Sequence, residues 1–406
     1  MKIRPERMLA DLDHLRTIGG KGTGVARRAF SDADIAARRW LAQRMTDAGL
    51  EVSVDECGNL FGLPPGDAPC LLIGSHSDTQ PLGGWLDGAW GVACGLELAR
   101  AALEQDGPRL AVVSFQDEEG RFGRLVGSTV WAGLSTLADV DDNLDEDATS
   151  EPITFGEARQ RAAEIAPLGS VSPARFVGYI EPHIEQGPVL DRSGEAVGVV
   201  KAIVGSRQWS MRFEGEANHA GTTPMPMRRD ALQGYIALAT AVNEAFAGMV
   251  GPRTVWTMGR VVVEPNAASI VPGAASFTVQ MRDPDAALLD TLAERVRVLA
   301  EEIATERQLK LDASEGLRFE PVALDDRLTG ALEQAAEDIA PGRWRRLPSG
   351  ALHDASNVAA VLPSAMIFAP SIGGISHNPN EDTRREDLSL ALETLAAAVG
   401  RLSNEI

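Results

Sequence analysis

Cysteine is scarce in this sequence, and long apolar runs are absent. Cys57, Cys70 and Cys94 contain no Cys-x-x-Cys pair, and an odd number leaves one over from any disulfide count, so we expect free thiols in a reducing compartment. No apolar run approaches the roughly 18 residues of a membrane span. Asp11 and Asp13 interrupt the stretch where a signal peptide needs apolar residues. The sequence therefore predicts a soluble cytoplasmic protein.

Positively charged residues are also few relative to negatively charged ones. Lys and Arg total 38 against 58 Asp and Glu, which gives a formal net charge of −20. Such a balance argues against a nucleic acid or a membrane as partner, because their phosphates would be repelled. Hydrophobic residues at 44% and charged residues at 24% are ordinary for globular proteins. The 406 residues suffice for two or three domains.

In the first half of the chain, strand and helix signals alternate. A helix is predicted over 32–48, because Ser31 can cap its first turn and Gly49 stands where a left-handed residue would end it. Apolar runs at 70–74 and 110–115 predict strands, with a helix over 91–102 between them. Near-continuous apolar strands separated by helices are typical of an α/β fold, with a mixed, mostly parallel sheet covered on both faces.

From about residue 205 the pattern changes to β-α-β-β-α-β, the order of a ferredoxin-like domain. The expected elements are strands at 209–213, 254–263, 275–282 and 309–313, with helices over 227–246 and from Pro284 to about 306. The α/β pattern then returns with a strand at 364–369 and a helix after Glu386. We therefore predict a discontinuous main domain, 1–204 with 319–406, and an inserted domain, 205–318.

Five of the six histidines lie in segments rich in Gly, Asp, Glu, Asn and Pro, which are typical of loops at the ends of strands and helices. They are His76, His183, His219, His353 and His377, whereas His14 lies in a helical stretch and is interpreted as structural. His76 and Asp78 are two residues apart, so on an extended segment they point to the same side. Asp78 can then accept a hydrogen bond from the imidazole and fix its tautomer. Asp87 follows between glycines and can either bridge two metal ions or cap the next helix.

A run of acidic side chains follows the strand predicted at 110–115. Asp117, Glu118 and Glu119 repel one another unless a cation or solvent relieves them, and a solvated acidic loop is the alternative interpretation. Adjacent glutamates suit a division in which one ligates a metal and the other handles protons. His183 and His377 add imidazoles, and no thiolate accompanies them. Imidazole with carboxylate suits Zn²⁺, Mn²⁺, Co²⁺ or Ni²⁺.

Longer motifs extend these segments over nearly the whole chain. They lie at 55–60, 74–79, 83–88, 118–120, 183–187, 216–225, 265–266, 349–355 and 376–377. With them the sequence resembles the hydantoinase/carbamoylase amidases, in the superfamily of dinuclear metallo-exopeptidases and aminoacylases. That family includes N-carbamoyl-L-amino acid hydrolases, allantoate amidohydrolases and β-ureidopropionases. The motifs at 183–187 and 216–225 are the most specific to this branch.

The resemblance implies that Asp87 bridges two divalent metal ions per chain and that Glu118 is the general base. It implies the remaining ligands as His76 and His183 for one ion and Glu119 and His377 for the other. It also implies a homodimer formed through the inserted lid domain, in which His219 stabilises the oxyanion in the partner's active site. Positions matched to the ureido and carboxylate groups of the substrate are Gln186, Asn266, Arg282 and Gly350.

The implied activity is hydrolysis of the ureido C–N bond of N-carbamoyl-L-amino acids to the amino acid, carbon dioxide and ammonia. The segment from Gln80 to Gly84 is closer to the carbamoylase version of that loop. Allantoate amidohydrolase is the alternative, followed by β-ureidopropionase or N-acyl-amino acid hydrolase. A catalytically silent small-molecule binding protein on the same scaffold is the non-enzyme alternative, against which the intact Glu118 argues. A nucleic-acid-binding inserted domain is the weakest alternative, given the net charge.

Four residues fit the family pattern less simply. Leu352 stands where the family commonly has glycine, which leaves the shape of the pocket there open. Trp85 and Trp90 flank Asp87 and either line a substrate pocket or serve ordinary packing. His353 matches a family motif, but no metal position remains for it, so we interpret it as structural support.

Overall fold

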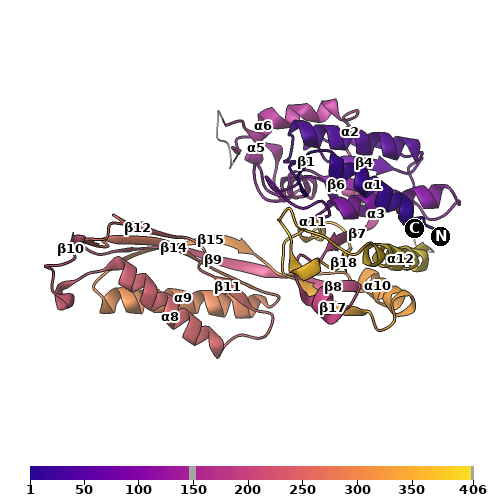
Figure 1. Ribbon diagram of the computed structural model, residues 1–406. Coiled ribbons are helices and arrows are strands. Elements are labelled where there is room, and N and C mark those ends of the chain that lie inside the picture. The colour runs from indigo at the N-terminus through magenta and orange to yellow at the C-terminus, as the bar shows by residue number, and fades with distance from the viewer. Residues whose placement is uncertain (146–151, 404–406) are drawn as a thin grey trace. The chain divides into compact units, whose positions relative to one another are not determined.

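The computed structural model describes residues 1–145 and 152–403 (Figure 1), and they divide into two compact units. One unit comprises residues 1–201 with 323–406, and the other comprises residues 202–322. From the sequence, the first domain is predicted to end at residue 204 and to resume at residue 319. Strands run up to the boundary on both sides, so the amino-acid composition does not change sharply where the chain passes from one unit to the other. The role of the second unit as a lid stays a prediction.

The first unit is built on a nine-stranded mixed sheet with the order β16-β8-β18-β7-β5-β6-β4-β3, in which β17 also pairs with β8. Its strands are β3 (Glu51–Val54), β4 (Leu60–Leu63), β5 (Cys70–His76), β6 (Leu110–Phe115), β7 (Phe176–Ile184), β8 (Val197–Ile203), β16 (Val322–Ala323), β17 (Trp344–Ser349) and β18 (Ser364–Ala369). Strands β6, β5, β7 and β18 pair in parallel, while β3, β4 and β8 join antiparallel. The predicted mixed α/β sheet is confirmed.

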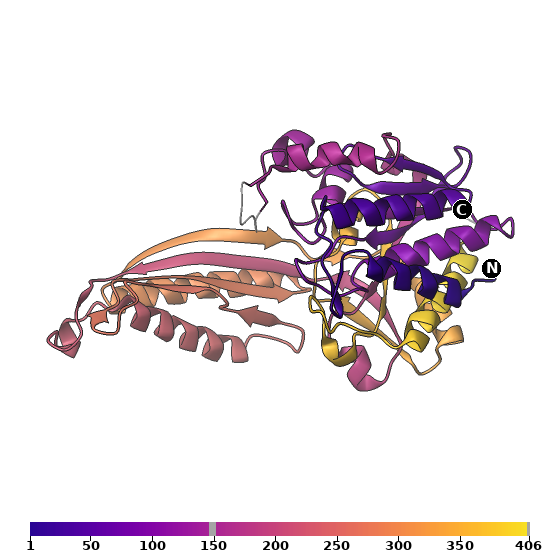
Figure 2. The same cartoon turned by 45° about the horizontal axis from the view of Figure 1, so that its top comes forward.

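Helices surround this sheet (Figure 2). They are α1 (Pro5–Thr17), α2 (Asp32–Asp47), α3 (Ala89–Leu103), α4 (Val126–Trp131), α5 (Leu137–Val140), α6 (Phe155–Ala158), α7 (Val189–Ser193), α10 (Asp326–Ile339), α11 (Asp354–Val358) and α12 (Arg385–Leu402), and a short hairpin pairs β1 (Gly20–Lys21) with β2 (Gly24–Val25). Helix α3 packs on β5, β6 and β7, α1 packs against both α3 and α12, and α12 packs against α10. Helix α2 packs on β3 and β4. None of the helices among the described residues has the length and apolar composition needed to cross a bilayer.

Helix α2 fixes the end of a central strand. As predicted, Ser31 caps it by accepting a hydrogen bond from the Asp34 amide at 3.2 Å. Arg38, one turn later, is fully buried and donates to Asp34 Oδ1 at 2.9 Å. The same guanidinium donates to the carbonyl oxygens of Ser114 at 3.0 Å and Phe115 at 2.6 Å, where β6 ends. A buried cation thus holds the point from which the acidic loop departs.

The second unit has one five-stranded antiparallel sheet with the order β11-β14-β9-β15, in which β12 also pairs with β14. Its elements are β9 (Gly205–Glu214), β10 (Asn218–His219), α8 (Ala231–Ala247), β11 (Val255–Thr257), β12 (Val261–Glu264), β13 (Ile270–Val271), β14 (Ala274–Asp283), α9 (Ala286–Glu306) and β15 (Lys310–Phe319). The sheet order is that of a ferredoxin-like domain, and α8 and α9 share an apolar core with it. The predicted inserted fold is confirmed.

The expected elements in this unit differ in their bounds: β9 and β15 are longer than the strands expected at 209–213 and 309–313, and three other differences have a local cause. The strand expected over 254–263 is two strands, because residues 258–260, including Gly259, interrupt the pairing with β14. Helix α8 begins at Ala231 rather than 227, after a 3-10 turn that follows Pro224 and contains Pro226. Helix α9 begins at Ala286 rather than at Pro284, because Asp285 is the N-cap and accepts hydrogen bonds from the first amides.

The buried cation of α2 makes a testable contribution to stability. Replacing Arg38 with Leu leaves the Asp34 carboxylate and two strand carbonyls without their donor, and the expected loss is about 3–5 kcal/mol in the free energy of unfolding. Chemical denaturation followed by far-UV circular dichroism measures it. The matched control is Arg39→Leu, whose side chain is about half exposed and pairs with Glu164, and which should cost less than about 1 kcal/mol. Equal losses for the two variants would contradict the assignment.

Candidate metal centre

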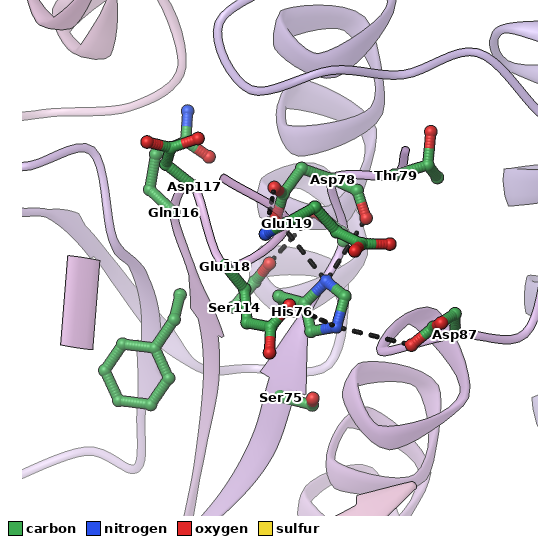
Figure 3. Close-up of polar contacts among 12 residues, drawn as sticks. Ser75, His76, Asp78, Thr79, Asp87, Ser114, Gln116, Asp117, Glu118 and Glu119 are labelled. Carbon is green, nitrogen blue, oxygen red and sulfur yellow. Dashed lines mark hydrogen bonds and ion pairs between the residues drawn. The ribbon is translucent and has the colours of Figure 1, made fainter. Parts of the chain in front are cut away.

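The metal-ligating side chains predicted from the sequence gather in the first unit, beyond the ends of its parallel strands. His76 is the last residue of β5, and His183 is the last but one of β7. Glu119 follows β6, Asp87 precedes α3, and His377 lies in the loop after β18. Since parallel strands end at a common edge of a sheet, three loops distant in sequence meet there. Figure 3 shows His76 at the end of its strand, facing Asp87 and the acidic loop.

The first group of ligands consists of His76, Asp87 and His183, all buried. The Oδ1 atom of Asp87 lies 3.0 Å from Nε2 of His183 and 3.6 Å from Nε2 of His76. Gly88, with φ of +63°, permits this approach, because a Cβ there would lie 2.4 Å from the His76 ring. Any other residue at this position would displace the imidazole.

The second group consists of Asp87, Glu119 and His377. Here the other carboxylate oxygen of Asp87, Oδ2, lies 3.3 Å from Nε2 of His377, which is 3.4 Å from Oε2 of Glu119. In each group the candidate ligand atoms all lie within 4.8 Å of one another. Asp87 is the shared residue, and it presents one oxygen to each group.

Backbone carbonyls orient the two buried imidazoles for metal binding. Nδ1 of His183 lies 2.9 Å from the carbonyl oxygen of Ile184, and Nδ1 of His76 lies 3.2 Å from that of Asp78. Both contacts place a ring proton on Nδ1, so Nε2, which faces Asp87, is the ring nitrogen that can ligate a metal ion. The carboxylate of Asp78 is at 3.5 Å from His76 Nδ1, so its carbonyl, rather than the carboxylate expected from the sequence, is the nearer acceptor. The carboxylate instead accepts from the Glu119 amide at 3.2 Å.

The residues present fit a cation. Nε2 of His76, Nε2 of His183 and Oδ1 of Asp87 are buried, and none makes a hydrogen bond of acceptable geometry with the described residues. Buried polar atoms normally have partners, and leaving them unpaired is costly. Two lone-pair nitrogens and a carboxylate oxygen converging on one point are a donor set for a borderline divalent metal ion. The chain therefore carries the side chains of a metal site.

The contacts between these side chains also determine whether Asp87 is ionised. Burial disfavours the charged form of Asp87, but its contacts with His183, His377 and His76 outweigh burial and hold its pKa well below the usual range. Its carboxylate is therefore ionised and able to ligate.

The two neighbouring glutamates respond in the opposite direction. Burial, followed by the charge of Asp87, raises the pKa of Glu119 to about 7. Burial also raises the pKa of Glu118 well above its usual range, the His76 imidazole opposes this shift, and the Glu119 charge adds to it. The crowded carboxylates repel one another, and a bound cation would relieve them.

Glu118 lies beside the first group without belonging to it. Its Oε2 is 3.5 Å from Nε2 of His76. The loop that carries it is held by Asp117, a buried residue at φ of +56° whose carboxylate accepts from the amides of Arg121 at 2.7 Å and Phe122 at 3.0 Å. The Glu118 carboxylate thus faces the candidate ligands, and the hydrogen bonds of Asp117 fix the loop that carries it.

The residues predicted to contact substrate lie in both units. Gln186 of the first unit donates from Nε2 to Asp87 Oδ2 at 2.8 Å, and Gly350 is exposed beyond β17. His219, Asn266 and Arg282 belong to the second unit. Arg282 Nε donates to Gln280 at 3.3 Å, and Asn266 is exposed with φ of +53°.

His219 has a defined tautomer. It is exposed on β10, and its Nδ1 accepts hydrogen bonds from the amides of Gly221 at 3.0 Å and Thr222 at 3.2 Å. A nitrogen that accepts two N–H groups carries no proton. The proton therefore lies on Nε2, which can donate to a negatively charged oxygen.

Trp85 and Trp90 are both buried, which favours the packing interpretation over a pocket-lining one. His353 is buried too: its Nε2 lies 2.8 Å from Ser349 Oγ, and its ring packs edge-on against His183 with centroids 4.4 Å apart. It supports a candidate ligand and contributes no ligand atom to either group. Leu352 is half-buried.

Glu381 is a contact residue of the centre that the sequence reasoning missed. Its carboxylate accepts from the backbone of Asp87 at 3.1 Å and from Ser376 Oγ at 3.0 Å. It stands four residues after His377 in a segment rich in Asn and Pro, and this proximity was the signal available.

Comparisons with known proteins identify the family of the chain. The chain matches peptidase family M20/M25/M40 over residues 72–401. It is 34% identical over 409 residues to an N-carbamoyl-L-amino-acid amidohydrolase of Paenarthrobacter aurescens, with 97% of each sequence covered. It is 35% identical over 389 residues to the allantoate amidohydrolase of Escherichia coli strain K12, covering 94% of this chain and 93% of that protein.

A solved structure extends the likeness to three dimensions. The crystal structure of an amidase of the hydantoinase/carbamoylase family from Burkholderia phymatum matches with a TM-score of 0.91 and 40% identity, covering 100% of this chain and 98% of that one. The resemblance inferred from the motifs is confirmed. The chain belongs to the hydantoinase/carbamoylase amidase family within peptidase family M20/M25/M40, and it is an amidohydrolase that acts on linear C–N bonds.

Proposed function

We propose that the chain hydrolyses the ureido C–N bond of N-carbamoyl-L-amino acids with the help of two divalent metal ions, each Zn²⁺, Mn²⁺, Co²⁺ or Ni²⁺. The observation that carries this proposal is the position of Asp87, whose two oxygens face separate ligand groups, with Glu118 beside one of them. His76 and His183 would hold one ion, and Glu119 and His377 the other. When bound, such ions supply Lewis acidity, which acidifies water and polarises a carbonyl group.

Glu118 has the position of a general base. It would take a proton from the attacking water and return it to the nitrogen that leaves, so that the carbamoyl compound and one water give the amino acid, carbon dioxide and ammonia. A ureido carbonyl is a weak electrophile, and the negative charge that develops on its oxygen needs donors. The Nε2–H of His219 supports that role, and removing such a donor typically costs about a hundredfold or more in rate.

The substrate's carboxylate and ureido groups require partners on the chain. Arg282 offers a planar guanidinium that can grip a carboxylate through two parallel hydrogen bonds. Gln186, Asn266 and Gly350 offer amide groups for the ureido end. With these assignments, the carboxylate of the L-amino acid portion is the group by which the site selects its substrate.

Relatives of similar identity carry both the N-carbamoyl-L-amino-acid and the allantoate name, so family membership alone does not choose the substrate. The segment from Gln80 to Gly84 favours the carbamoylase assignment. In the structure, Gln80 Nε2 donates to Glu119 Oε2 at 2.6 Å, which places this segment at the second ligand group. Allantoate is the second candidate.

A substrate panel tests the proposal. We expect kcat/KM for N-carbamoyl-L-methionine to exceed that for allantoate and for N-acetyl-L-methionine by about tenfold or more, because a site built to pair a ureido group and one carboxylate rejects analogues that leave polar groups unpaired. Released amino acid and ammonia are quantified with the Mn²⁺-loaded enzyme. Turnover of allantoate alone would overturn the substrate assignment, and no turnover of any amide would overturn the hydrolase proposal.

A second prediction separates the base from its neighbouring ligand. Glu118→Gln should keep about two metal ions per chain while kcat falls by at least about a hundredfold, because an amide cannot accept the proton. Glu119→Gln is the matched control and should lose metal instead. Metal content by elemental analysis and steady-state kinetics are measured on the same preparations. Substantial activity in Glu118→Gln would reject the base assignment.

A third prediction concerns the oligomer. We infer a homodimer in which His219 serves the partner's site, because His219 is exposed in the second unit while the ligand groups lie in the first. Glu118→Gln and His219→Ala chains should each be inactive, and exchanging their subunits should restore up to about one quarter of wild-type activity, since half of the dimers are hybrids with one intact site. Restored activity is compared with subunit exchange measured by native mass spectrometry. Exchange without restored activity would reject the shared site.

A further inference from the structure

Glu381 connects two loops of the centre from a buried position. Its side chain is 2% exposed, in the segment that follows His377. One carboxylate oxygen, Oε1, accepts from the backbone amides of Leu86 at 3.0 Å and Asp87 at 3.1 Å. The other, Oε2, accepts from Ser376 Oγ at 3.0 Å. One carboxylate therefore holds both the backbone of the shared ligand and the residue next to His377.

Two further contacts close this frame. Ser376 Oγ also lies 3.1 Å from Asp87 Oδ2, the oxygen that faces the second ligand group. Trp85 Nε1 donates to the carbonyl oxygen of Glu381 at 3.1 Å. The Asp87 loop is thus fixed through its backbone, its side chain and a neighbouring tryptophan, all by residues of the His377 loop.

The sequence of the Asp87 loop accommodates the carboxylate. A Cβ at Gly84 would lie 2.0 Å from the Glu381 carboxyl carbon. Real Cβ atoms do not approach so closely, so any side chain at Gly84 would displace the carboxylate. The glycine is therefore explained by the presence of Glu381 rather than by a turn.

We propose that Glu381 is a positioning residue that sets the distance between Asp87 and His377 and thereby the geometry of the second ligand group. The proposal rests on the metal site proposed above. Glu381 makes none of the candidate ligand contacts itself; it acts through Asp87 and Ser376. Hydrogen-bond partners behind metal ligands typically alter metal affinity by about 10- to 100-fold when removed.

Binding of Mn²⁺ measured without substrate tests the proposal. The full-length chain is stripped with a chelator and titrated with Mn²⁺, and free ion is quantified by electron paramagnetic resonance. Glu381→Ala should weaken the binding of one ion by about 10- to 100-fold. Glu381→Gln should stay within a few-fold of wild type, because its amide oxygen can still accept from the two backbone amides and its NH₂ group can donate to Ser376. Excess Mn²⁺ should restore most of the kcat of Glu381→Ala.

A control variant and a second test variant distinguish a specific role of Glu381 from a general loss of stability. Thr383→Ala removes a buried hydrogen bond of the same segment, from its hydroxyl to the Pro370 carbonyl at 2.6 Å, and should leave Mn²⁺ affinity unchanged. If Glu381→Ala does not fold, Gly84→Ala displaces the carboxylate instead and should show the same loss. Wild-type affinity in the folded variants, or an equal loss in Thr383→Ala, would overturn the role of Glu381. Failure of the wild type to bind Mn²⁺ would overturn the metal site instead.

Discussion

The centre depends on one carboxylate that is shared between two sets of ligands. Asp87 turns Oδ1 toward the buried imidazoles of His76 and His183, and Oδ2 toward His377. Each oxygen can serve only one group, so the orientation of this side chain determines whether two sites or one can form. Glu381 holds the backbone of Asp87, and the absence of a side chain at Gly88 leaves room for the His76 ring beside it.

The fold brings these groups together through the parallel part of the sheet. Strands β5, β6, β7 and β18 end at one edge, and each carries a candidate ligand near its end or in the loop that follows. Buried polar contacts then fix the loops: Arg38 holds the end of β6, and Asp117 holds the turn that presents Glu118. This arrangement buries a cluster of acids and imidazole nitrogens that lack hydrogen-bond partners among the described residues, which costs free energy of folding. Binding of a cation would offset that cost and would couple occupancy of the site to the stability of the unit.

Much of the fold follows from local patterns. Apolar runs marked β5, β6 and β18, and the cap and terminal glycine marked α2. The ferredoxin-like order of the second unit was readable because its helices and strands have distinct periodicities. Bounds failed where local chemistry competes with periodicity, as at Gly259 and at Asp285. The boundary between the two units was harder to predict, because strands continue up to it on both sides.

The residue pattern was enough to predict the chemical types in the centre: imidazoles and carboxylates, without thiolates, in loops after apolar strands. The folded chain was needed to show which oxygen of Asp87 faces which group, that the carbonyl rather than the carboxylate of Asp78 lies nearer His76, and that Glu381 joins two loops. Residue type and local spacing are encoded along the chain, so motifs record them. Distances between loops depend on strand pairing and on buried hydrogen bonds between residues remote in sequence, which no local pattern contains.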